Sequence, residues 1–165
     1  MIESAGVHRP ADEAVMGSIE LRSDARSKTI AATPDEVFAA IADPDRIARW
    51  WGPSGFRNTI HEFDFVPGGR WRLTMHGPDG QDHANESRFL RIVPGRAVQI
   101  EHLSGHHFLL SLDLSATPDG TRVHWCQTFD TIEHYRQIAP FVAQANEQNL
   151  ERLAQEVGRR GTDAR

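Results

Sequence analysis

The chain has 165 residues, of which 39% are hydrophobic and 25% are charged, a composition typical of one soluble globular domain. Its 18 Lys and Arg residues against 23 Asp and Glu residues give a net charge of −5, which argues against binding to nucleic acid or to an anionic membrane surface. The single cysteine, Cys126, excludes an intramolecular disulfide framework and a cysteine-rich zinc site. No apolar run approaches the roughly 20 residues of a membrane span. Residues 1–17 contain no apolar signal segment, so we expect a cytoplasmic protein.

Hydrophobic periodicity begins only after the first 17 residues. We therefore predict a disordered N-terminal tail at residues 1–17, a folded domain at residues 18–158 and a loose C-terminal end at residues 159–165. Within the domain, loose alternation over residues 18–32 predicts a first strand.

Two short helices are predicted after this strand. Thr33 to Glu36 form a capping box, with Pro34 at the first helical position. Asp43 and Pro44 repeat the cap and proline signal and open a second helix that ends near Trp50.

The remainder predicts consecutive strands followed by one long helix. Alternation and Gly- or Pro-containing turns delimit strands at residues 56–65, 70–76, 83–93, 97–103, 106–116 and 121–129. An apolar stripe of helical period extends from Ile138 to Val157, with Pro140 expected in its first turn and Gly158 expected to end it. This helix alone is long enough to cover one face of the sheet. The fold class is therefore α+β.

Several motifs in this order resemble a known family. They are Asp43-Pro44 followed by Trp50 to Pro53, then Phe63 to Trp71, and finally Gln148 to Leu153. The chain resembles the START-like (SRPBCC) superfamily, and within it the group named after the activator of the heat-shock-protein ATPase. The resemblance implies a helix-grip fold, in which a curved antiparallel sheet of about seven strands wraps a long C-terminal helix, with two short helices after the first strand. Such domains often have a cavity between sheet and helix, whereas their functions vary.

Strand parity predicts the residues that would line this cavity. The sheet would contribute Trp71, Leu73, Met75, His102, Phe108, Leu110, Trp125 and Gln127, and the helix would contribute Phe141, Val142 and Ala145. This face describes either a pocket for an apolar molecule oriented by His102 and Gln127, or a filled core with two satisfied polar residues. Trp51 either plugs the short helices onto the sheet or lies at the cavity mouth. Glu86, whose direction parity leaves open, becomes an acid/base candidate if it points inward.

The nine histidines do not follow a metal-ligand spacing. His106 and His107 are adjacent on a predicted strand and would point to opposite faces. We also find no nucleophile motif and no phosphate-binding loop, so we predict no metal, no cofactor and no assigned catalytic residue.

Three functions compete. The first is binding of a small apolar or aromatic molecule in the cavity, and the second is a polyketide cyclase or dehydratase-like enzyme using the same cavity. The third, implied by the family's name, is a co-chaperone that stimulates a heat-shock ATPase. We rank it last and expect no chaperone partner, because the chain has no room for the additional domain that grips the chaperone. Leu103 and Leu109 on the outer sheet face leave a homodimer possible.

Overall fold

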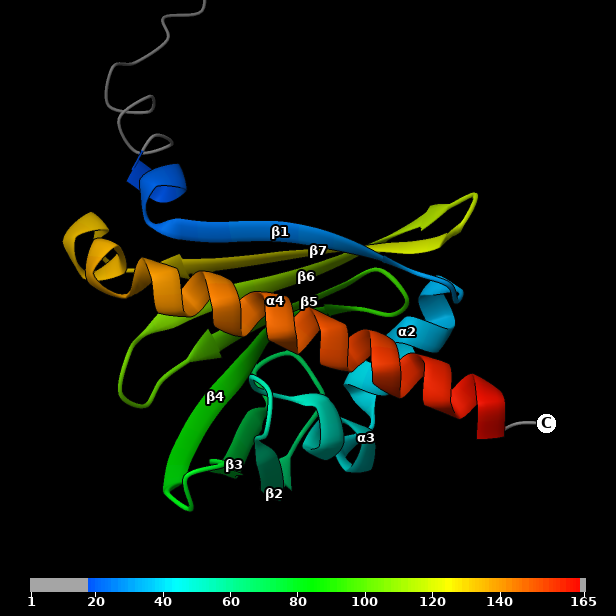
Figure 1. The fold of residues 1–165 in the computed structure, drawn as a ribbon, viewed down its shortest axis with the longest axis horizontal. Helices are drawn as coiled ribbons and strands as arrows, with labels where there is room; N and C mark the ends of the chain where they lie inside the picture. The colour runs from blue at the N-terminus through cyan, green and yellow to red at the C-terminus, as the bar shows by residue number, and fades with distance from the viewer. Residues whose placement is uncertain (1–17, 164–165) are drawn as a thin grey trace, which may run out of the picture.

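The computed structural model describes residues 18–163 and confirms the α+β helix-grip fold, with a curved antiparallel sheet around a long C-terminal helix (Figure 1). Its elements are β1 (Ser23–Ile30), α2 (Pro34–Ala42), α3 (Pro44–Trp50), β2 (Arg57–Phe63), β3 (Arg70–His76), β4 (Asp82–Val93), β5 (Ala97–His102), β6 (Phe108–Thr117), β7 (Gly120–Phe129) and α4 (Ile132–Asp163). The seven strands lie in the order β1-β7-β6-β5-β4-β3-β2. The two edge strands, β1 and β2, are joined through α2 and α3, which lie beside the C-terminal half of α4 in Figure 1.

The starts of both short helices follow the predicted capping signals. The backbone amide of Glu36 donates to Thr33 Oγ1 at 3.2 Å, and Thr33 Oγ1 donates to Glu36 Oε1 at 3.1 Å. At the second helix, the backbone amide of Asp45 donates to Asp43 Oδ1 at 2.9 Å. The bonds from the amides of Glu36 and Asp45 satisfy donors that the first helical turn leaves without partners.

The first strand is shorter than predicted. It begins at Ser23, and residues 18–21 are helical instead of extended. β7, the strand that pairs with β1, ends at Phe129, whose amide donates to the carbonyl of Arg22. Residues 18–21 therefore have no neighbouring strand along which to extend.

The terminal helix is longer than predicted at both ends. It begins at Ile132, so Pro140 lies inside it and not in its first turn. Its first turn is capped by Thr131 Oγ1, which accepts from the amide of His134 at 3.1 Å. It also continues through Gly158 to Asp163, so the expected stop at Gly158 is wrong and residues 159–163 extend the helix. One glycine costs a helix only about 1 kcal/mol, and the Arg159–Glu156 ion pair, at 3.3 Å, supports the turn that contains it. The predicted tail at residues 1–17 lies outside the described residues.

The turn between β2 and β3 requires both of its glycines. Gly68 has a φ of +82°, the left-handed region that favours glycine. A Cβ atom on Gly69 would collide with the carbonyl oxygen of Asp64. The turn also contacts β4, because Gly68 donates its amide to the Phe89 carbonyl at 2.7 Å and Phe89 donates back to Gly69 at 2.9 Å.

The two halves of α4 meet the sheet differently. In the C-terminal half, Leu150, Leu153 and Val157 are buried in the main hydrophobic cluster. In the N-terminal half, Phe141 is 69% exposed and Ala145 is half-buried. The C-terminal half therefore closes the core, whereas the N-terminal half buries Val142 and Asn146 but leaves Phe141 exposed.

An ion cluster fixes α3 against the packed half of α4. Glu156, which is buried, accepts from Arg49 Nη2 at 2.6 Å and from Arg46 Nε at 3.3 Å. Burial would raise the pKa of Glu156, but the hydrogen bonds and positive charges of Arg49, Arg46 and Arg159 together outweigh it, so this pKa lies below its ordinary value. The cluster positions the end of α3, from which one wall of the cavity continues.

Candidate functional site

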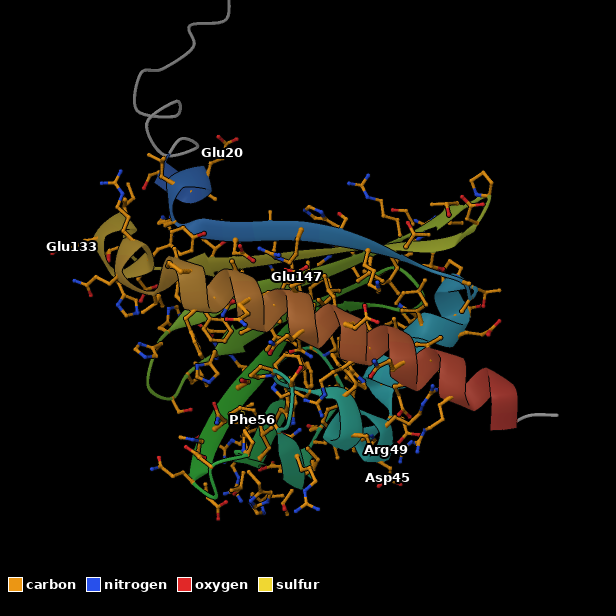
Figure 2. All side chains as sticks on the ribbon, in the orientation of Figure 1. Glu20, Asp45, Arg49, Phe56, Glu133 and Glu147 are labelled. Atoms are coloured by element: carbon orange, nitrogen blue, oxygen red, sulfur yellow. The ribbon has the colours of Figure 1, made fainter. Side chains whose placement is uncertain are left out.

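A cavity of about 480 Å³ lies between the concave face of the sheet and the N-terminal half of α4. It brings together most of the residues predicted from strand parity: Trp51, Met75, His102, Phe108, Leu110, Trp125, Gln127, Phe141, Val142 and Ala145. Its walls are mainly apolar, which is typical of a small-molecule site. Figure 2 shows Phe56 on the side of the helix facing β3 and β4, whereas Glu147 lies on the exposed surface of α4.

Three predicted residues do not line the cavity. Trp71 and Leu73 are fully buried in the packed core, where the Trp71 ring stacks on Phe89 with a centroid separation of 5.8 Å. Glu86 is on the outer face, where its carboxylate lies 3.3 Å from Arg70 Nε. Trp71 pairs with Ser87 across β3 and β4, so Ser87 points inward and Glu86 must point outward. Glu86 is therefore no acid/base partner for His102.

The two adjacent tryptophans have different roles. Trp50 is buried, and its Nε1 donates to the carbonyl of Ala40 at 2.9 Å, so it plugs α3 onto α2. Trp51 is half-buried and lines the cavity, with ring centroids 4.7 Å from Trp71 and 6.0 Å from Trp125. Trp50 therefore belongs to the packed core, whereas Trp51 lies in the wall of the cavity.

His102 is held by hydrogen bonds at both ring nitrogens. Nδ1 lies 2.7 Å from the His106 carbonyl, and Nε2 lies 2.6 Å from Asn85 Oδ1, while the ring stacks on Phe108 at 4.5 Å. Asn85 Nδ2 donates to the His83 carbonyl at 3.1 Å, which orients the amide oxygen toward the imidazole. Burial lowers the pKa of His102. The ring is thus fixed at the cavity end formed by β4 and the β5–β6 loop.

A second polar group in the lining belongs to a buried network. Asn146 on α4 donates through Nδ2 to Gln127 Oε1 at 2.9 Å and to Asp24 Oδ2 at 3.0 Å. Arg26 also donates to Asp24, at 2.8 and 2.9 Å. Burial opposes ionisation of Asp24, but the hydrogen bonds from Arg26 and Asn146 keep its pKa below the ordinary value. This network ties α4 to β1 and β7 beside the cavity.

The segment between α3 and β2, residues 51–56, forms one wall and is held by α4. Asn149 accepts from the amide of Gly52 at 3.1 Å and donates to the Trp50 carbonyl at 2.9 Å. Arg152 donates to the carbonyls of Arg49 (2.6 Å), Trp51 (3.1 Å), Gly52 (2.8 Å), Pro53 (2.9 Å) and Phe56 (2.7 Å). One guanidinium therefore binds most of the carbonyl groups around this loop.

Several lining residues were not predicted from the sequence: Gly52, Pro53, Phe56, His83, Asn85, His106, Asn146 and Asn149. His83 and Asn85 share the inward parity of Ser87 on β4, a signal that was available once the direction of Ser87 was known. Asn146 follows Val142 by one helical turn, so the helical spacing could have predicted that Asn146 lies on the cavity side of the helix. His106 lies in a loop, where no periodicity applies.

The surface has a second hollow, away from α4. This larger hollow, about 690 Å³, lies near the β4–β5 turn, where Asp35, Arg91, Arg96 and Asp113 mix charges of both signs. It lacks the aromatic walls of the cavity beneath α4, so we favour the cavity beneath α4 as the candidate site.

Within residues 18–163, no group of three or more His, Cys, Asp or Glu side chains is arranged to hold a metal ion. The described helices also include none with the length and apolar character of a membrane span.

A curved antiparallel sheet, a long terminal helix and a cavity between them define a helix-grip domain of the START-like (SRPBCC) class. The family model described as "Activator of Hsp90 ATPase homolog 1-like protein" matches residues 31–158. The chain belongs to this family, which confirms the resemblance found in its motifs.

Solved structures with the same fold come from several bacteria. A protein from Nitrosomonas europaea has a TM-score of 0.78 and 15% identity, covering 86% of this chain and 97% of that one. A protein from Chromobacterium violaceum has a TM-score of 0.70 and 23% identity, covering 82% and 96%. An AHSA1-like protein from Aeromonas hydrophila has a TM-score of 0.67 and 23% identity, covering 84% and 94%. Identities this low support the fold alone, and a comparison with curated proteins found no match.

Proposed function

We propose that this protein binds a small, predominantly apolar molecule in the cavity beneath α4. The observation that carries the proposal is the cavity itself, about 480 Å³ with aromatic walls and a few fixed polar groups. Trp51 and Trp125 offer flat apolar surfaces, whereas His102 and Gln127 are held in place by neighbours on other elements. Pre-positioned polar groups in an apolar cavity are the usual basis for orienting a ligand.

The two other functions have less support from the site. A cyclase-like enzyme would need a positioned acid and base, but no carboxylate occurs among the described residues that line the cavity. A co-chaperone role is suggested by the family's description, but the apolar lining of the cavity does not point to a chaperone partner. Ligand binding is therefore the function that best accounts for the cavity.

The proposal is tested by calorimetric titration of the full chain with naphthalene-2-carboxamide, a neutral aromatic probe. In the variant Ala145→Phe, the new ring fills the cavity from α4, so we expect at least tenfold weaker binding than in the wild type. Gln144→Phe adds the same ring on the exposed side of the helix and serves as the control, with unchanged affinity. No binding by the wild type, or equal binding by wild type and Ala145→Phe, would contradict the proposal.

A further inference from the structure

The cavity contains an unusual set of ionisable groups. Among the described residues that line it, the titratable side chains are His83, His102 and His106, without any Asp, Glu, Lys or Arg. The nearby carboxylates face elsewhere: Glu86 pairs with Arg70, and Glu101 binds partners on the outer face. A positive charge acquired by this end of the cavity would therefore have no carboxylate beside it in the lining.

The hydrogen bonds of His102 suit a protonated ring. The His106 carbonyl can only accept, so Nδ1 donates to it. Nε2 faces Asn85 Oδ1, which is also an acceptor because Asn85 Nδ2 donates to the His83 carbonyl. The imidazolium donates from both nitrogens and satisfies both oxygens. In the neutral ring, one of these contacts places two acceptors against each other unless the Asn85 amide turns over.

The surroundings of His102 oppose that protonation. Burial lowers the pKa of His102, and positive charge on His106 or His107 would lower it further. His83 approaches the same end from β4, and on α4 the ring of His134, which is not among the lining residues, stacks on His106 with ring centroids 4.8 Å apart. The ring thus has hydrogen-bond partners for its charged form, but it lacks the counter-ion that would stabilise the charge in a buried place.

We infer that the cavity selects ligands with an aromatic or apolar body and one anionic oxygen group, such as a carboxylate, phenolate or enolate, seated at the His83–His102–His106 end. This inference rests on the proposed function and names its ligand class. The anionic group supplies the missing counter-ion, so His102 takes up a proton when the ligand binds. The apolar body lies against Trp51 and Trp125, where the described lining residues include no Asp, Glu, Lys or Arg.

Proton uptake makes the affinity depend on pH in a defined direction. One proton taken up on binding strengthens the affinity by at most about tenfold per unit of falling pH, as long as His102 is neutral in the free protein. A carboxylate ligand stays ionised across pH 6–8, so it shows this dependence. A neutral ligand of the same shape does not offer a counter-ion, and its affinity stays nearly constant.

The test titrates the full chain with three probes of matched shape: 2-naphthoate, naphthalene-2-carboxamide and 2-naphthylmethylammonium. At pH 6 we expect the carboxylate to bind at least tenfold more tightly than the amide, with the ammonium weakest, and we expect this preference to shrink at pH 8. Heats measured in buffers of different ionisation enthalpy report the proton taken up with the carboxylate.

Variants assign the effect to His102. His102→Gln should lose both the preference for the carboxylate over the amide and the proton uptake. His61→Gln, a change at an exposed histidine on β2, should leave both intact. Should His102→Gln fail to fold, proton uptake by the wild type with the carboxylate, and its absence with the amide, still tests whether the cavity selects anionic ligands. Equal affinity for the carboxylate and the amide overturns this inference while the proposed function stands, whereas failure of all three probes to bind overturns both.

Discussion

Arg152 offers a sharp test of how the cavity wall is built. Its guanidinium donates to five carbonyl groups around residues 49–56, and four of these bonds are partly buried. Replacing Arg152 with Ala removes every one of these donors at once. The carbonyl groups would then depend on water that must enter between α4 and the loop.

The expected loss of stability follows from these bonds. A hydrogen bond from a charged donor contributes about 1.5–3 kcal/mol when buried, and we take about 1 kcal/mol for each partly buried bond because water can replace it. Four such bonds give about 4 kcal/mol, and we assign nothing to the exposed bond to the Arg49 carbonyl. This is a large share of the 5–15 kcal/mol that typically stabilises a domain.

The assay is urea unfolding followed by circular dichroism, with naphthalene-2-carboxamide binding measured on the folded variant. Arg152→Lys should lose an intermediate amount, because an ammonium has three donors and cannot serve five acceptors. Arg136→Ala, an exposed arginine on the same helix, should change stability by less than about 0.5 kcal/mol. A loss below about 1 kcal/mol for Arg152→Ala would refute the role assigned to this side chain.

Two further predictions concern His107, which pairs with Glu101 on the outer face, and Asn146 in the cavity lining. His107 hydrogen-bonds two carboxylates, which raise its pKa above the ordinary value. Its stabilising effect is therefore complete below the unfolded pKa of about 6.5 and is lost as the pH rises through the raised folded pKa. The Tm difference between wild type and His107→Gln should be larger at pH 5.5 than at pH 9, and a difference independent of pH would contradict this assignment. Asn146→Leu removes a hydrogen bond to buried, ionised Asp24 and should cost about 2 kcal/mol in urea unfolding at pH 7, whereas an unchanged midpoint would show that the network contributes nothing.

Strand parity predicted the inner face of the sheet wherever the strands are regular. Trp125 and Gln127 on β7 and Leu110 on β6 face inward as expected from alternation. Alternation failed on β4 because a bulge between Phe89 and Arg91 shifts the register, so the two halves of that strand follow different parities. The direction of Glu86 could not be derived without knowing where the bulge falls.

The cavity itself could not be predicted from residue types. Whether Val142 and Ala145 leave a void depends on how α4 lies across the sheet, and that is set by contacts such as the buried Arg46–Glu156 pair at the opposite end of the helix. The hydrogen bonds from Arg152 to the carbonyl groups of residues 49–56 could not be predicted from the sequence either. A long side chain can reach backbone carbonyls far away in sequence, and such contacts leave no periodic pattern.

The central claim, that the cavity beneath α4 holds a small apolar molecule, is tested most directly by NMR on the labelled full chain with naphthalene-2-carboxamide. We predict intermolecular NOEs from the aromatic protons of the probe to the methyl groups of Val142 and Ala145. NOEs confined to residues on the outer surface of α4 or of the sheet, or no binding at all, would contradict it.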